Sequence, residues 1–238
     1  MAPIGQHRGE TGKAGQGGRR GLCPAGMTRR LTFEFCALYL AAPVAMAVLL
    51  PATWLFPVLF AVTAAGLLLL HLTPGFDWAD LTRGAGRIGW GRVALFALLT
   101  AVAAVGAATL FAPEARFGLI RQRPELMLMI AALYPLLSAL PQEIVFRPLF
   151  FRRYGPILPT DARLQIALNA AVFALAHLMY WNALVAVLTF AGGLVFAHAY
   201  RVRQNFPEAV VLHAVGGILV FAAGLGVFFY SGNVVRPF

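Results

Sequence analysis

The stretch LMLMIAALYPLLSALPQEIVFRPLFF spans residues 126–151 and contains only two charged side chains, Glu143 and Arg147. A membrane-spanning helix needs about 20 predominantly apolar residues, because each residue adds about 1.5 Å and the hydrocarbon core is about 30 Å thick. This stretch is long and apolar enough to span a bilayer. It therefore predicts an α-helical membrane protein.

The composition of the whole chain agrees with this prediction. The 238 residues are 60% hydrophobic and 12% charged, whereas about 25% of the residues of a typical soluble domain are charged. So few polar side chains cannot cover the surface of a soluble domain, and that class is excluded. The net charge of +10 would suit nucleic-acid binding only if the basic residues clustered on a soluble face. They lie instead in short segments between apolar runs, so no nucleic-acid partner is predicted.

Six further apolar runs accompany residues 126–151. They are residues 32–50, 53–72, 92–112, 162–180, 183–200 and 208–230. The sequence thus predicts an all-α, polytopic membrane helix bundle of seven helices, or eight if the run at 126–151 or at 208–230 is broken in two. Residues 75–92, which contain several charged residues and two tryptophans, are expected to form an interfacial loop or short helix.

The basic residues between these runs predict the orientation of the chain. Arginines are concentrated in three loops, which the positive-inside rule places in the cytoplasm together with the N-terminus. These loops contain Arg83, Arg87 and Arg92; Arg152, Arg153 and Arg163; and Arg201 and Arg203. The loop at residues 113–125 opposes this assignment, because it contains three arginines and would face outward.

Residues 1–30 differ in composition from the rest of the chain. They contain almost no large apolar side chains, so they are predicted to be a disordered basic tail before a membrane domain at residues 31–238. Met27, which is followed by two arginines and an apolar run, is an alternative start of the protein. The two cysteines, Cys23 and Cys36, are too few for a disulfide framework.

Ionisable residues inside the predicted spans are the candidates for function, because a charge at the bilayer centre costs about 2.5–3.5 kcal/mol or more. Glu143 and Arg147 are four residues apart and share a helix face. His177, with Phe173 one turn before it, lies late in the fifth span, and His213 lies early in the last. Each can be structural when taken alone, as a packing ion pair or as a hydrogen-bonded core histidine. Together, an acid and two histidines on three spans are what a water-activating site needs.

A count of depth tests whether these residues can meet. At 1.5 Å per residue from the cytoplasmic ends of their spans, Glu143 and His213 lie at about 13 and 9 Å and His177 at about 21 Å. These heights differ by one to two helical turns. Helix tilt and a kink at Pro141 are needed to bring all three together.

The three segments resemble the motifs of the CPBP superfamily of intramembrane peptidases, also called the CAAX protease, bacteriocin-processing or Abi family. The family motifs are Glu-Glu-x-x-x-Arg, Phe-x-x-x-His and His-x-x-x-Asn on successive membrane helices. This chain matches them in order at Glu143 and Arg147, at Phe173 and His177, and at His213. The resemblance covers about residues 125–230.

The chain departs from these motifs at two positions. Gln142 stands where the family has its first glutamate, and Gly217 stands where the last motif has asparagine. A bacterial branch related to the CAAX prenyl proteases looks similar in both departures. Asn182, at the turn between the fifth and sixth predicted spans, is a possible polar substitute for the missing asparagine, or simply a turn residue.

The resemblance implies a hydrolase of the bacterial inner membrane that cuts a membrane-associated or C-terminally prenylated protein. Glu143 would be the general base, with Arg147 keeping it ionised. His177 would orient the water or protonate the leaving amine, and His213 would donate to the oxyanion. The same three residues also form an open zinc-ligand set, so the use of a metal stays open.

Two other functions remain open at this point. Loss of the base at Gln142 would leave a catalytically inactive membrane scaffold or immunity protein. The acid and histidines could also form the proton relay of a small transporter. No internal repeat supports that second alternative.

Overall fold

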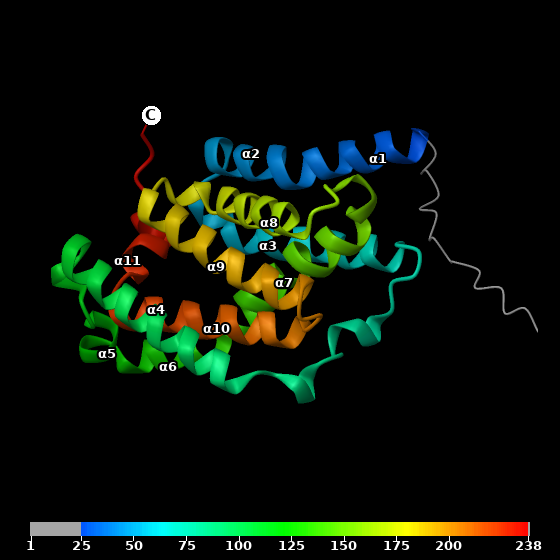
Figure 1. The fold of residues 1–238 in the computed structure, drawn as a ribbon. Helices are drawn as coiled ribbons and strands as arrows, with labels where there is room; N and C mark the ends of the chain where they lie inside the picture. Colours follow the sequence, from blue (N-terminus) through cyan, green and yellow to red (C-terminus); the bar gives the residue numbers. More distant parts are fainter. Residues whose placement is uncertain (1–24, 238) are drawn as a thin grey trace, which may run out of the picture.

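The structure, a computed structural model, describes residues 25–237, and these residues form helices and connecting turns without a β-strand (Figure 1). The helices in chain order are α1 (Ala25–Cys36), α2 (Ala42–Leu49), α3 (Leu55–His71), α4 (Trp90–Phe111), α5 (Gly118–Gln122), α6 (Pro124–Tyr134), α7 (Leu140–Ile144), α8 (Ala162–Ala176), α9 (Ala183–Arg201), α10 (Phe206–Ala223) and α11 (Gly226–Phe229).

Some of these helices join through π-helical segments into longer rods. The segment Ala37–Ala41 joins α1 to α2, and Pro135–Ala139 joins α6 to α7. A third π-helical segment, Val145–Arg153, continues α7 and has Pro148 in its interior. Proline lacks an N–H and clashes with the carbonyl four residues earlier, and a wider turn relieves both problems. Residues 126–151 therefore lie in one helical rod, with one wide segment on each side of α7.

The predicted all-α membrane bundle is confirmed. Within residues 25–237, six helical rods are long and apolar enough to cross a membrane, and they span 26–49, 90–111, 124–153, 162–180, 183–201 and 206–223. The remaining predicted run corresponds to α3, which is apolar but only 17 residues long.

The last predicted run, 208–230, is too long. Its helix α10 ends at Ala223 because Gly224 adopts a left-handed conformation with φ of 106°. A side chain at Gly224 would collide with the backbone of Ala115 and Arg116. The apolar residues beyond it form the separate short helix α11, which is too short to cross a membrane.

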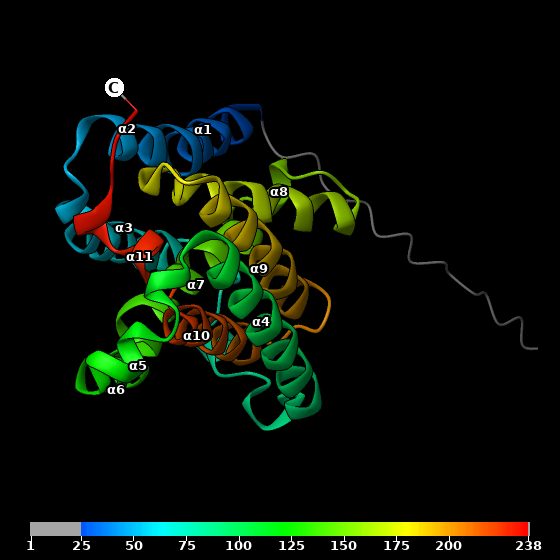
Figure 2. The same cartoon turned by 90° about the vertical axis from the view of Figure 1, so that its left-hand side faces the viewer.

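The rods are arranged so that α10 lies inside the bundle. One side consists of the α1–α2 rod, with α8 and α3 beside it (Figure 1). On the other side, α10 packs between α4 and the α6–α7 rod (Figure 2). Helix α9 connects the two sides, because it packs against both α8 and α10. The three predicted motifs therefore lie on adjacent helices.

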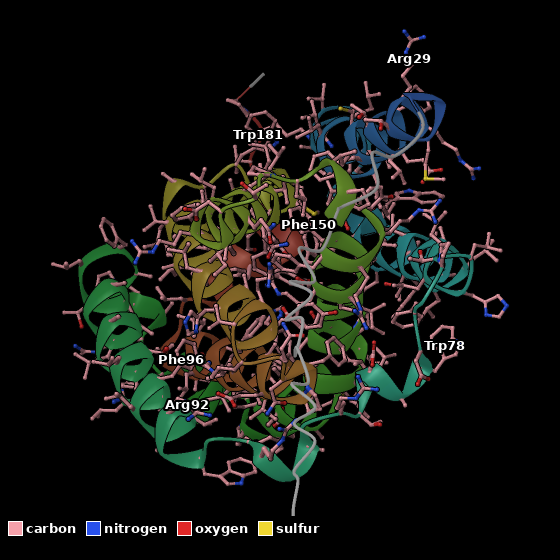
Figure 3. The ribbon with its side chains drawn as sticks, turned by 45° about the vertical axis from the view of Figure 1, so that its right-hand side comes forward. Arg29, Trp78, Arg92, Phe96, Phe150 and Trp181 are labelled. Atoms are coloured by element: carbon pink, nitrogen blue, oxygen red, sulfur yellow. The ribbon has the colours of Figure 1, made fainter. Side chains whose placement is uncertain are left out.

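Aromatic side chains fill the interior next to the wide segment Val145–Arg153. Phe150 is fully buried in the middle of the bundle (Figure 3). Its ring meets that of Tyr39 edge to face, with centroids 5.4 Å apart. The Tyr39 hydroxyl donates a 2.6 Å hydrogen bond to the Val145 carbonyl. This bond satisfies the polar end of a residue that is otherwise packed in the core.

Residues 75–89 form a loop with short 3₁₀ turns, as expected for an interfacial segment. Glu208, at the start of α10, fastens this loop. Its fully buried carboxylate accepts hydrogen bonds from the Gly89 N–H and from the Arg92 guanidinium at 3.0 Å, and it pairs with Arg203. From the sequence, Glu208 was expected only to lie at the boundary of a helix. The burial of its carboxylate could not be predicted from that position.

The expected disordered tail lies mostly outside the described residues, which begin at residue 25. Residues 25–30, at the end of that predicted tail, belong to α1. An ion pair one turn apart between Arg30 and Glu34, at 2.8 Å, supports this helical start. Glu34 also pairs with Arg153 at 2.7 Å and thereby ties α1 to the end of the long rod.

Candidate active site

Glu143 and Arg147 form a buried ion pair on the α6–α7 rod. Both side chains are inaccessible to solvent. Arg147 Nε donates to Glu143 Oε2 at 2.7 Å, and Nη2 donates to Oε1 at 3.1 Å. This bidentate hydrogen bonding is the strongest interaction that arginine makes with a carboxylate. The pair predicted from the spacing of four residues is therefore present and anchors the acid rigidly.

The third nitrogen of the Arg147 guanidinium, Nη1, contacts a neighbouring helix. Its Nη1 donates to Asn169 Oδ1 on α8, and the Asn169 amide donates to the Phe146 carbonyl at 2.6 Å. The guanidinium also lies over the rings of Phe173 and Phe196, 5.2 and 5.8 Å from their centroids. Such cation–π contacts favour a charge that has lost its water. Asn169 and Phe196 were not among the predicted site residues.

His213 on α10 contacts the anchored acid. Its Nδ1 lies 2.9 Å from Glu143 Oε1. Because a carboxylate can only accept, Nδ1 carries the proton, and in the neutral ring Nε2 is left as an acceptor. The Tyr134 hydroxyl lies 3.2 Å from that Nε2. The imidazole is stacked on Phe196 with 4.9 Å between ring centroids, so its orientation is fixed from both sides.

His177 lies at the end of α8, separated from the Glu143–His213 pair by Phe173. Its Nδ1 is 2.8 Å from the Phe173 carbonyl, which can only accept, so this ring also keeps Nε2 as its acceptor. The Phe173 ring is 4.8 Å from the His177 ring and 5.5 Å from the His213 ring, centroid to centroid. Phe173 thus spaces the two imidazoles.

A cavity of about 720 Å³ inside the bundle brings these groups together. Its polar lining includes Tyr134, Ser138, Gln142, His177 and His213. Most of the other lining residues are apolar and come from α2, α3, α4, α6 and α9. Glu143 is not among the lining residues, whereas His213, which contacts it, is. A hollow with a few polar groups on apolar walls is typical of a ligand site.

Residues 124–219 match the family model described as type II CAAX prenyl endopeptidase Rce1-like. In this segment the chain is CAAX protease-like. The match confirms the resemblance inferred from the motifs, and the family is a protease family, which indicates a hydrolase in an integral membrane protein. Comparisons with curated proteins and with solved structures gave no match.

The CAAX protease-like segment contains the cavity residues Gln142 and Gly217, at which the chain departs from the family motifs. The Gln142 amide donates to Ser138 Oγ at 3.0 Å, whereas its buried Oε1 has no hydrogen-bond partner in the described part of the chain. A buried acceptor without a partner costs about 1–3 kcal/mol. It marks a place where a bound molecule can donate.

Asn182, the possible polar substitute for the missing asparagine, lies at the start of α9. Its Oδ1 accepts a 3.2 Å hydrogen bond from the Val185 N–H, and it caps the first turn of α9. It is not among the residues that line the cavity. This is the usual role of asparagine before a helix, where it satisfies a backbone N–H that has no partner within the helix.

The possible zinc-ligand set, Glu143 with His177 and His213, does not fit the observed geometry. Within residues 25–237, no group of three His, Cys, Asp or Glu side chains is close enough to hold a metal ion. Both Glu143 oxygens accept hydrogen bonds from Arg147 or His213, and His213 Nδ1 is bound to the acid. A ligand carboxylate must also turn an oxygen toward the metal, and Glu143 is not among the residues that line the cavity.

Proposed function

We propose that this protein is an intramembrane endopeptidase that hydrolyses a peptide bond of a membrane-associated or C-terminally prenylated protein. One contact supports this most strongly. His213, on the wall of the cavity, lies 2.9 Å from a carboxylate that Arg147 anchors. The family match at residues 124–219 supports the same reaction class. We place the bundle in the inner membrane of a bacterium, with its N-terminus in the cytoplasm.

The contacts favour His213, rather than Glu143, as the group that takes the proton from water. Glu143 is hydrogen-bonded through both oxygens and lies behind the imidazole. In this position it fixes the tautomer of His213 and stabilises the imidazolium that forms, as the acid of a catalytic triad does for its histidine. Glu143 is then a positioning residue, and Arg147 keeps it ionised.

In the proposed reaction, a water molecule in the cavity attacks the carbonyl carbon of the scissile bond while its proton passes to His213 Nε2. The C–N bond of the tetrahedral intermediate then breaks, and the imidazolium returns the proton to the leaving amine. His177 Nε2 and Gln142 Oε1 are acceptors at the same cavity, and either of them can accept the second hydrogen of the water. One base and one acceptor position the nucleophile.

The cavity walls away from the histidines favour an apolar substrate. Phe56 and Leu59 of α3, Leu99 of α4 and Met129 of α6 are among its lining residues. A charged peptide would lose its hydration there without a partner. A prenylated or membrane-inserted segment would bury apolar surface at about 25 cal/mol per Å².

The test uses the full chain in liposomes with three fluorogenic peptides: a prenylated C-terminal peptide, the same peptide without the prenyl group, and a membrane-inserted leader peptide. We expect cleavage of at least one apolar substrate and a loss of at least about 100-fold in His213→Ala and Glu143→Gln. His71→Ala is the matched control, because His71 is exposed at the end of α3. Cleavage that survives both site variants would refute the assignment.

Gln142 favours one other function, a catalytically inactive scaffold or immunity protein. If the folded wild type cuts none of the peptides and Gln142→Glu gains cleavage, this alternative replaces the peptidase proposal.

A further inference from the structure

Tyr134 and Gly217 share one space in the site. A Cβ atom at Gly217 would collide with the Tyr134 ring and with its hydroxyl oxygen. Gly217 lies one turn after His213, so a side chain there would lie beside the imidazole on the same face of α10. The chain has no side chain at that position. The Tyr134 phenol, which comes from α6, fills the space instead.

Tyr134 is held in this place by several contacts. Its hydroxyl lies 3.2 Å from His213 Nε2, and its ring meets those of His213 and Phe221 edge to face, at 6.0 and 5.9 Å between centroids. Because the neutral His213 presents a lone pair at Nε2, the phenol donates its proton in this hydrogen bond. Tyr134 is therefore an oriented O–H donor at the cavity.

The reaction proposed above needs such a donor. A carbonyl oxygen gains negative charge when water attacks, and a hydrogen-bond donor placed on it lowers the barrier. The two imidazoles and the Gln142 amide already donate elsewhere. His177 donates from Nδ1 to a backbone carbonyl, and the Gln142 amide donates to Ser138. The imidazole of His213 donates to Glu143.

We propose that Tyr134 is a catalytic residue whose hydroxyl donates to the carbonyl oxygen of the scissile peptide bond, in the place that a side chain at Gly217 would otherwise occupy. This inference rests on the peptidase function proposed above. When His213 Nε2 takes the proton from water, it can no longer accept from the phenol. The O–H then turns to the oxyanion, and Tyr134 stays neutral throughout the reaction.

The first test compares Tyr134→Phe with wild type in the liposome assay. Phenylalanine keeps the ring beside Gly217 and removes only the hydroxyl. We expect kcat to fall by about 100- to 1,000-fold, as it does when one oxyanion donor is removed, with little change in KM. Tyr200→Phe is the matched control, because Tyr200 packs against Phe151 and does not line the cavity.

The second test exchanges the two positions. Gly217→Asn alone is expected to inactivate the protein, because the new side chain collides with Tyr134. In Tyr134→Ala/Gly217→Asn the collision is removed and an amide donor lies one turn from His213. We expect this double variant to be at least about tenfold more active than Tyr134→Ala. A purely structural role of the phenol would give no such rescue.

A readout without turnover completes the test. In a sample with ¹⁵N-labelled histidine, Tyr134→Phe is expected to shift the Nε2 resonance of His213, assigned with His213→Gln, and to leave that of His71 in place. An active wild type with equally active Tyr134→Phe would overturn the Tyr134 proposal and leave the peptidase function standing. An unchanged His213 resonance would also overturn it. A wild type that cuts no peptide would overturn both.

Discussion

Arg147→Met offers the sharpest test of how the site is held together. In the wild type, Arg147 makes two hydrogen bonds to Glu143 and one to Asn169, and both charged side chains are fully buried. Methionine keeps much of the volume and removes the charge. Glu143 is then a buried charge without its counter-ion, a change that costs about 3–5 kcal/mol. That corresponds to a loss of about two to four powers of ten in the folding equilibrium.

The free energy of unfolding can be measured by titrating SDS into dodecylmaltoside micelles and following helix content by circular dichroism. Arg123→Met, at an exposed arginine before α6, is the matched control and is expected to change it by less than about 0.5 kcal/mol. The double variant Glu143→Gln/Arg147→Met is expected to be at least about 1 kcal/mol more stable than Arg147→Met, because it contains no unpaired buried charge. The amide oxygen of the new glutamine can still accept a hydrogen bond from His213. Equal stability of Arg147→Met and wild type would refute the reasoning.

Three further predictions concern other parts of the molecule. Gly224→Ala is expected to destabilise the fold by about 1–3 kcal/mol in the same titration, because φ of 106° is a left-handed conformation that alanine disfavours. Gly106→Ala is the control. Gly106 lies within α4 with open space around it, so this change should be neutral or slightly stabilising. Glu208→Gln should weaken the attachment of residues 75–89 by about 1.5–3 kcal/mol, seen as faster trypsin cleavage in that loop; an unchanged cleavage rate would contradict this. Gln142→Met should lower kcat/KM by about tenfold, because the variant loses one hydrogen bond to water. Ser138→Ala should lower kcat/KM less. Equal losses in the two variants would show that packing, and not the Gln142 hydrogen bond, causes the decrease.

The sequence was sufficient to predict the parts of the fold and site that depend on polarity and spacing. Lipid penalises charge strongly, so the few ionisable residues inside apolar runs were conspicuous, and Glu143, Arg147 and His213 are in contact as expected. The end of α10 was missed, because the residues after Gly224 are as apolar as those before it. The helix ends there because of the backbone conformation of Gly224 and the close approach of the backbone at Ala115 and Arg116.

The aromatic and amide residues of the site could not be singled out in this way. Phe196 and Asn169 enclose Arg147, yet a phenylalanine in an apolar helix has no feature that separates a site residue from a core residue. Tyr134, in contrast, could have been singled out from the sequence. Tyr134, Ser138 and Gln142 are polar residues spaced four apart in an apolar helix, and all three line the cavity. Polar side chains in a lipid-embedded helix need hydrogen-bond partners, as single charges do.

The two departures from the family motifs are compatible with a site of the proposed kind. Glu143 and His213, at similar heights, touch directly, whereas His177, counted one or more turns away, is separated from them by Phe173. A base made of an acid and the histidine in front of it does not require a second acid at position 142. An uncharged glutamine there can hold the water through its acceptor oxygen without adding a second negative charge beside Glu143. In the proposed mechanism, the glutamine and the glycine are parts of one arrangement, in which His213 is the base and a phenol is the donor.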